Sequence, residues 1–310
     1  MVKAEHDNTT SKKLGIIHIV LSSFSFALMS MFISLTGDIP VYEKAFFRNF
    51  VALVMALIIL SRSKERFRIK KGSASGLLFR ALFGTIGLVA NFYAVSEINI
   101  SDAMMLNKLS PFFAVIASVF ILKESITPSQ LGFILLAIIG AVFVVKPSFI
   151  VSALTGNAES GSFAAVIGLI GGVSAGIAYS FVRKLSTQGE RAMVIICFFS
   201  LFSCIALIPP IILTYQRPSP VQFLYMLLTG CSALMGQVNI TKAYSYAPAG
   251  EISVYDYSGV IFAAILGMIF LGETPDIYSI AGYLIIVGAS VLSFLYNSNR
   301  HTRVYRRGNT

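Results

Sequence analysis

"AVSEINISDAMMLNKLSPFFAVIASVFILKE" (residues 94–124) is repeated 149 residues later in the chain as "AYSYAPAGEISVYDYSGVIFAAILGMIFLGE" (residues 243–273). The alignment has no gap, and both stretches close on a glutamate, Glu124 in the first and Glu273 in the second. Ser25 meets Ser174 at the same offset. One unbroken register through two long apolar segments indicates an internal repeat, and we expect halves at residues 1–150 and 151–310.

The composition around this repeat is that of a membrane protein. Of the 310 residues, 56% are hydrophobic and only 12% are charged, with a mean hydropathy of +0.79. A soluble domain carries about 25% charged residues. The apolar residues occur in blocks of about 20, the length of a helix that crosses a bilayer core of about 30 Å. The sequence therefore predicts an all-α integral membrane protein.

Turn and charge signals divide the apolar residues into ten segments that do not alternate as barrel strands would. We expect ten transmembrane helices, near residues 14–35, 42–60, 74–96, 101–122, 128–146, 163–184, 190–213, 221–245, 251–271 and 277–296.

The basic residues set the orientation. With the N-terminus inside, seventeen lysines and arginines fall in inner loops and tails, against two outside, Lys146 and Arg217. An excess of cytoplasmic Lys and Arg is the general rule for membrane proteins. We expect both termini in the cytoplasm, and we interpret the formal charge of +10 as a signal of orientation and not of nucleic-acid binding.

Five spans per half is an odd number, so the second half enters the membrane upside down. Lys123, at an inner helix end, has the uncharged Gly272 as its repeat partner, which agrees with an outer position there. Two inverted five-helix repeats are the architecture of secondary transporters, whose site lies between the halves at the midplane.

The sequence at this point resembles the EamA-type drug/metabolite transporters. The resemblance rests on a Tyr-Ala step at Tyr93, a Ser-Asp-Ala start at Ser101, the mid-span Pro111 and the closing glutamates. It implies a central cavity lined by spans 1–4 and 6–9, with spans 5 and 10 at the periphery, and it leaves the substrate open. Because Pro111 meets Val260 in the second half, a helix break at the proline need not be mirrored.

Two cations are expected at similar depths, Arg48 in span 2 and Lys108 in span 4. Without an acid between them they would form a positive site, and an arginine can bind both oxygens of a carboxylate. Two alternatives stay open. Both side chains could snorkel to the outer headgroups, or Glu43 could neutralise Lys44 or Arg48 within the helix.

Asp256 is the carboxylate well inside a span, at the repeat position of Asn107. Ionisable groups inside the membrane usually face a cavity or a partner. Asp256 could carry a coupling proton or hold an amine, and the structural alternative is a salt bridge to Lys242.

Neutral polar side chains on several spans could complete a substrate site, although tyrosines also occupy interfacial belts and amides also join helices. These candidates are Asn91, Tyr93, Asn107, Tyr179, Gln237, Asn239, Tyr255 and Tyr257. Glu124 and Glu273 are interpreted as helix-end residues, His18 as structural, and the face made by Gly168, Gly172 and Gly176 as a close packing surface.

These observations favour a secondary transporter of the cytoplasmic membrane. It would move a small polar metabolite, with a lean toward a carboxylate-bearing organic or amino acid, by alternating access, and a proton is the candidate coupling ion. The alternative is a non-transporting accessory protein, such as a subunit of a lipid-linked-sugar flippase. The sequence contains no catalytic, metal or cofactor motif, so we expect no enzyme activity. The expected partners are the substrate and the bilayer.

Overall fold

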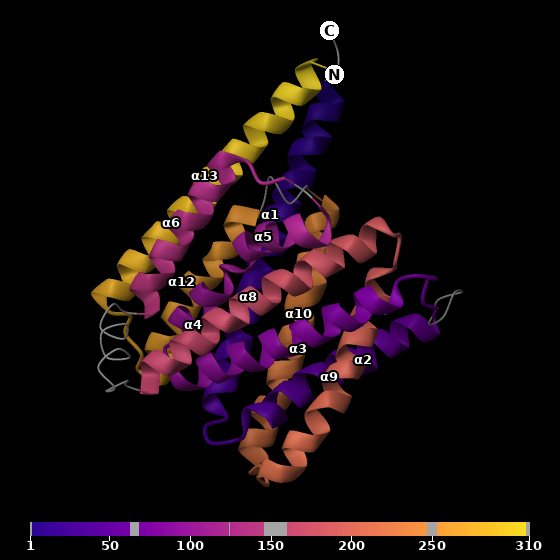
Figure 1. Ribbon diagram of the computed structural model, residues 1–310. Helices are drawn as coiled ribbons and strands as arrows, with labels where there is room; N and C mark the ends of the chain where they lie inside the picture. The colour runs from indigo at the N-terminus through magenta and orange to yellow at the C-terminus, as the bar shows by residue number, and fades with distance from the viewer. Residues whose placement is uncertain (1, 63–67, 124, 146–159, 247–252, 308–310) are drawn as a thin grey trace.

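The structure is a computed structural model that describes residues 2–62, 68–123, 125–145, 160–246 and 253–307. Every regular element in these ranges is helical (Figure 1). The elements are α1 (Val2–Leu35), α2 (Val41–Ser61), α3 (Ala74–Glu97), α4 (Ile100–Asn107), α5 (Ser110–Ile121), α6 (Pro128–Val145), α8 (Ser160–Thr187), α9 (Ala192–Thr214), α10 (Pro220–Tyr246), the 3-10 helix η1 (Ser253–Tyr257), α12 (Ser258–Leu266), the π-helix η2 (Gly267–Leu271) and α13 (Ile277–Arg307).

These elements form ten candidate membrane spans of 18 to 25 residues, which confirms the expected fold class. α1 and α13 extend beyond their apolar parts, and the start of α1 and the end of α13 project together at one end of the bundle (Figure 1). We call this end the terminal side and the other end the far side. An even number of spans returns the chain to the side from which it started.

The packing follows the repeat. Span 1 (α1) packs on span 8 (α10), and its repeat equivalent is the packing of span 6 (α8) on span 3 (α3). The contact of α5 with α8 is matched in the same way by that of α12 with α1, and the contact of α2 with α10 by that of α9 with α3. The pairs α2–α9 and α6–α13 each join a helix to its own repeat partner. The two halves therefore interlock around an approximate two-fold axis and share one core.

The fourth and ninth spans are irregular at equivalent positions. The fourth is interrupted at Lys108 and Leu109, between α4 and α5. The ninth changes from the 3-10 helix η1 to α12 directly after Tyr257, which is the repeat partner of Lys108. The interruption is thus mirrored although Pro111, in the first turn of α5, is not.

The ends of these two spans are mirrored as well. Lys123 is the non-glycine residue with positive φ among the described residues, at 57°. Its repeat partner Gly272 has φ 67°. Both residues lie in the left-handed region, just past the last turn of a span, where glycine is the usual choice.

The glycine face of α8 is a packing surface, as predicted. A Cβ added to Gly172 would lie 2.6 Å from the carbonyl oxygen of Leu106, and one added to Gly176 would lie 2.6 Å from Cβ of Phe113. Both contacts are with the fourth span, so the missing side chains allow α8 to approach α4 and α5 closely.

Candidate functional site

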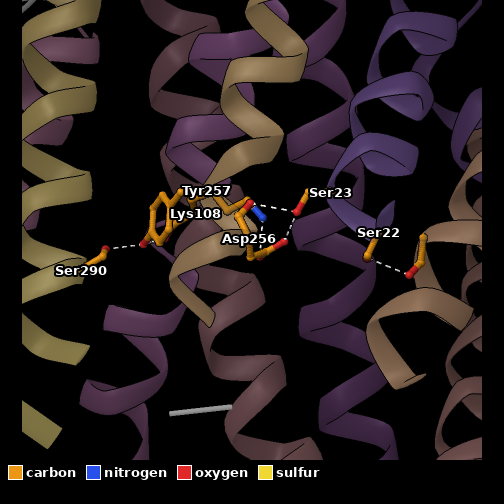
Figure 2. Close-up of polar contacts among 7 residues, drawn as sticks. Ser22, Ser23, Lys108, Asp256, Tyr257 and Ser290 are labelled. Atoms are coloured by element: carbon orange, nitrogen blue, oxygen red, sulfur yellow. Dashed lines mark hydrogen bonds and ion pairs between the residues drawn. The ribbon is translucent and has the colours of Figure 1, made fainter. Parts of the chain in front are cut away.

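An ion pair joins the fourth and ninth spans at the centre of the molecule. The Nζ of Lys108 donates to Oδ2 of Asp256, and Ser23 of α1 donates to Oδ1 of the same carboxylate at 2.7 Å (Figure 2). The side chains of Lys108 and Asp256 are 15% and 21% exposed. The Asp256 carboxylate therefore binds two groups, the Ser23 hydroxyl of α1 and the ammonium of Lys108 at the end of α4, and its charge is balanced by one lysine.

Tyr257 holds the backbone beside this pair. Its hydroxyl donates to the carbonyl oxygen of Lys108 at 3.2 Å, and it also shares a hydrogen bond with Ser290 of α13 (Figure 2). In the same view Ser22 of α1 donates to the carbonyl oxygen of Gly236 in α10 at 2.8 Å. The ninth span is thus hydrogen-bonded to α1 and α13, and α1 is hydrogen-bonded to α10 beside it.

The depth of this cluster follows from the repeat. Lys108 and Tyr257 are equivalent residues of two inverted halves. The distance of Lys108 from the far side therefore equals the distance of Tyr257 from the terminal side. Since the two residues touch, both must lie near the midplane. This is where transporters built from inverted repeats place their sites.

Arg48 and Arg80 form a second group of charges. The Cζ atoms of these arginines, from α2 and α3, lie 5.8 and 4.1 Å from the ring centroid of Phe199 in α9. Both distances are within the range of a cation–π contact. The Nε atom of each arginine is buried without a hydrogen-bond partner, while Nη1 of Arg48 donates to Oδ1 of Asn49 at 3.0 Å.

Tyr179 of α8 links the two groups. It interacts electrostatically with Arg80, Asp256 and Arg48. The side chain is 51% exposed. Tyr179, predicted as a substrate contact, is therefore within electrostatic range of both charged groups.

A glycine makes room for one of the arginines. A Cβ added to Gly84 of α3 would lie 2.0 Å from Nη1 of Arg80 and 2.9 Å from the ring of Phe199. The guanidinium of Arg80 therefore runs along its own helix over Gly84, and this position brings it to the ring that Arg48 also contacts.

The predicted site of Arg48 and Lys108 without an acid needs correction. Lys108 is paired with Asp256, and the second cation beside Arg48 is Arg80. An expected depth along a helix does not specify which way each helix is rotated. The structure also gives Asp256 a cationic partner different from the Lys242 that we considered.

The charges at the start of α2 have structural partners. Glu43 accepts a hydrogen bond from the backbone N–H of Gln216 at 2.9 Å. Lys44 donates to the carbonyl oxygen of Gly37 at 2.9 Å and to Oγ of Ser96 at 3.0 Å. Glu43 therefore does not neutralise Arg48 within the helix.

The remaining predicted residues lie in several surroundings. Asn91 has a buried Nδ2 without a partner, whereas Asn239 is hydrogen-bonded to His18 at 2.8 Å. Tyr93 packs edge-on against Phe163, Tyr255 is exposed, and Gln237 has an interaction partner. Asn107, partly buried, directly precedes Lys108.

Sequence reasoning missed Arg80, Phe199 and Ser23. Arg80 is one of five basic residues that fall within or at the edge of a span and so outside the orientation count, but only Arg48 and Lys108 were considered as cations of the site. Its depth, about six residues inside the span, could have identified it by the argument applied to Arg48. Nothing in one sequence distinguishes Phe199 or Ser23 from the many other phenylalanines and serines.

The structure also contains an apolar cavity of about 390 Å³ between α3, α5 and α8. Phenylalanines and aliphatic side chains form its lining, among them Phe79, Phe113 and Phe181. A polar metabolite would find no hydrogen-bonding side chain there, so the charged groups are the better candidate for its recognition.

Ten spans in two inverted, interlocked repeats, with ionisable groups at the midplane, define a membrane transporter. The model of the EamA-like transporter family matches residues 13–146 and again residues 162–295. The chain belongs to this family, which is part of the drug/metabolite transporter superfamily.

Curated relatives are transporters of several organisms. The chain is 31% identical over 281 residues to the "Pseudopaline exporter CntI" of Pseudomonas aeruginosa, covering 90% of this chain and 95% of that one. It is 26% identical over 287 residues to human "Solute carrier family 35 member G1", covering 90% and 78%. A solved crystal structure with 16% identity has a TM-score of 0.58 and covers 93% of this chain and 97% of its own, a likeness that concerns the fold alone.

Proposed function

We propose that this transporter is a secondary carrier that exports a small carboxylate-bearing organic or amino acid by alternating access. Its place would be the cytoplasmic membrane, with the terminal side of the bundle in the cytoplasm, as the basic residues predict. The observation that carries the proposal is the convergence of Arg48 and Arg80 on one ring inside the bundle.

Two properties of these arginines support binding of a carboxylate. Among the described residues, no carboxylate forms an ion pair with either guanidinium, and each has an Nε–H without an acceptor. A guanidinium binds a carboxylate through two parallel N–H···O bonds and stays charged at all physiological pH values. The site thus offers donors to a substrate that brings the acceptors.

The ion pair of Lys108 and Asp256 is proposed as the element that responds to a proton. Protonation of Asp256 would remove its negative charge and leave Lys108 without a counter-charge. A substrate carboxylate could then pair with Lys108. Tyr179 is within electrostatic range of Asp256 and of both arginines. Intramembrane carboxylates of transporters commonly carry such protons.

Alternating access is supported by the interlocked repeats. Apart from α2–α9 and α6–α13, which join a helix to its own repeat partner, the major contacts between the halves occur twice, once toward each side of the molecule. A rearrangement that opens one side could therefore use the contacts that close the other, as in other inverted-repeat carriers. The glycine-lined contact between α8 and the fourth span, at Gly172 and Gly176, offers a smooth surface for such a movement.

Export is the proposed direction for two reasons. The Pseudomonas aeruginosa relative is named an exporter. A membrane potential that is negative inside also favours the outward movement of an anion, by about 2.3 kcal/mol per charge per 100 mV. An anionic substrate can thus leave the cell without an ATPase.

The test is uptake or counterflow in proteoliposomes with a panel of carboxylates. Arg48→Ala should abolish transport. Arg48→Lys should retain a minor part of it, because a lysine keeps the charge but lacks the planar guanidinium that binds both carboxylate oxygens. Arg217→Gln, at an exposed position of the far-side loop, is the matched control and should transport normally. Full activity of Arg48→Ala would exclude the role given to this residue.

Ligand-dependent thermal stabilisation in detergent separates a carrier from an accessory protein. A ligand that binds the folded state raises its apparent stability in proportion to ln(1 + [L]/Kd). We expect at least one carboxylate of the panel to stabilise the protein. An accessory subunit that moves nothing would show no stabilisation by any small metabolite.

A further inference from the structure

The positive charges of the site exceed its negative charges by two. Lys108 and Asp256 neutralise each other, so this pair adds no net charge. Arg48 and Arg80 are close enough to interact electrostatically with each other. Among the residues that the structure describes, neither forms an ion pair with an acid. The arginine group therefore has a net charge that the protein itself does not balance.

Two like charges in a membrane-embedded group are unfavourable, and arginine cannot relieve the repulsion by losing a proton. The ring of Phe199 offers each guanidinium a cation–π contact, but a ring carries no net charge. Tyr179 is an uncharged neighbour. An external anion is thus the component that would complete the group.

Resting on the function proposed above, we infer that the substrate carries two carboxylates, of which one binds Arg48 and the other binds Arg80. The two guanidiniums come from different helices and lie at different distances, 5.8 and 4.1 Å, from the Phe199 centroid. Two separate fork-shaped donors fit two separate planar carboxylates better than one compact anion. A short dicarboxylate supplies two planar carboxylates and the two negative charges.

The position of Arg80 over Gly84 allows a second test of the dicarboxylate site. Nη1 of Arg80 lies over Gly84, where a methyl group would come within 2.0 Å of it. Gly84→Ala keeps both positive charges and improves the helix propensity of α3, yet it forces the guanidinium away from its place. If dicarboxylate recognition depends on the positions of both guanidiniums, Gly84→Ala will weaken dicarboxylate binding without changing the charge of the site.

The experiment measures thermal stabilisation of the full chain in detergent by succinate, butyrate and inorganic phosphate at equal ionic strength. The wild type should bind succinate about tenfold or more tightly than butyrate, since a second charge-assisted hydrogen-bonded pair is worth at least that much. Arg48→Gln, Arg80→Gln and Gly84→Ala should each reduce this ratio toward one. Arg80→Lys should recover part of it, and Arg217→Gln should leave it unchanged.

Other outcomes are equally decisive. Equal stabilisation of the wild type by succinate and butyrate would overturn the dicarboxylate inference while leaving a carboxylate carrier in place. Stabilisation by phosphate without succinate would overturn it in favour of a compact dianion. If no carboxylate stabilises the protein at all, the proposed function itself fails. The comparison of ligands on the wild type holds even where a variant does not fold.

Discussion

Asp256 is the residue through which the second half of the molecule forms an ion pair with the first half. Its carboxylate takes a hydrogen bond from Ser23 and an ion pair from Lys108, both of the first half. Its repeat partner Asn107 is neutral, so the acid is present in only one half of a symmetric scaffold. This asymmetry is expected of chemistry that serves a substrate or a proton, since the scaffold itself does not need it.

The energetic value of this pair can be tested by a double-mutant cycle. Asp256→Asn leaves Lys108 charged and unpaired at the midplane, and Lys108→Met does the same to Asp256. Each change should lower the free energy of unfolding in detergent by about 3 kcal/mol, the usual effect of breaking a buried ion pair. The double variant, which has no charge to leave unpaired, should recover most of the loss.

Tyr255→Phe is the control for this cycle, since Tyr255 is an exposed neighbour of Asp256. It should unfold like the wild type. Losses that simply add in the double variant would show that Lys108 and Asp256 act independently, against the geometry of Figure 2.

Residue type and depth were readable from the sequence at this scale, but partners were not. Asp256 and Lys108 were identified because a charge inside an apolar segment is costly whatever surrounds it. Their pairing depends on the rotation of two spans that are 148 residues apart. Arg80 meets the same criterion, but the comparison of cations within spans was limited to Arg48 and Lys108.

At the scale of the element, the ends of the fourth and ninth spans show how the repeat handles one backbone conformation. Lys123 and Gly272 both have positive φ, and only Gly272 adopts it without steric cost. Nothing lies within 4 Å of a Cβ added to Gly272, so the difference between the two positions is conformational.

Lys123→Gly should therefore stabilise the protein. An L-residue in the left-handed region costs roughly 1–2 kcal/mol, while glycine loses somewhat more backbone entropy on folding, which leaves a gain of about 0.5–1 kcal/mol. The measurement is the thermal midpoint in detergent. Lys123→Ala removes the charge but keeps the Cβ, so it should bring no gain. A gain of the same size for alanine would assign the effect to charge.

Glu273 caps a helix of the other half. Its Oε2 accepts the backbone N–H of Ile100 at 2.8 Å, in the first turn of α4, where Asn99 makes no side-chain cap of its own. Burial, together with the nearby charge of Asp102, raises the pKa of Glu273 above its ordinary value of 4.5, against the opposing effect of the Ile100 hydrogen bond. The interpretation of this residue as a helix-end group is thus supported.

The raised pKa has a defined consequence for stability. Because the folded state holds the Glu273 proton more tightly than the unfolded state, this residue favours folding most below pH 4.5. Its contribution then declines as the pH rises through the folded pKa, by up to about 1.4 kcal/mol per pH unit.

Glu273→Gln keeps an acceptor for Ile100 and cannot titrate. The stability of the wild type minus that of the variant should fall as the pH rises above 4.5 and then become constant. A pH-independent difference between the two unfolding curves would contradict the raised pKa.

For the whole molecule, the sequence was sufficient for the number of spans and for the inverted repeat. Apolar length is a local property, and an odd number of spans per repeat determines the inversion. The interlocking of the halves was not predictable in the same way, since α1 packs on α10 and α3 on α8, each pair joining helices of different halves. These contacts depend on which face of each helix carries small side chains. That face cannot be identified from the sequence when the apolar faces of a helix have similar compositions.

Inversion has a direct experimental signature, because equivalent residues of the two halves must lie on opposite sides of the membrane. Ser125 and Thr274 are separated by the repeat offset, follow their spans by a few residues and are both exposed. In a background with the exposed Cys231 replaced by alanine, Ser125→Cys should react with a membrane-impermeant maleimide only in inside-out vesicles. Thr274→Cys should react only in intact cells, because its loop lies on the far side. Labelling of both cysteines from the same side would contradict the inversion, whereas the reversed pattern would keep the inversion and place the termini outside.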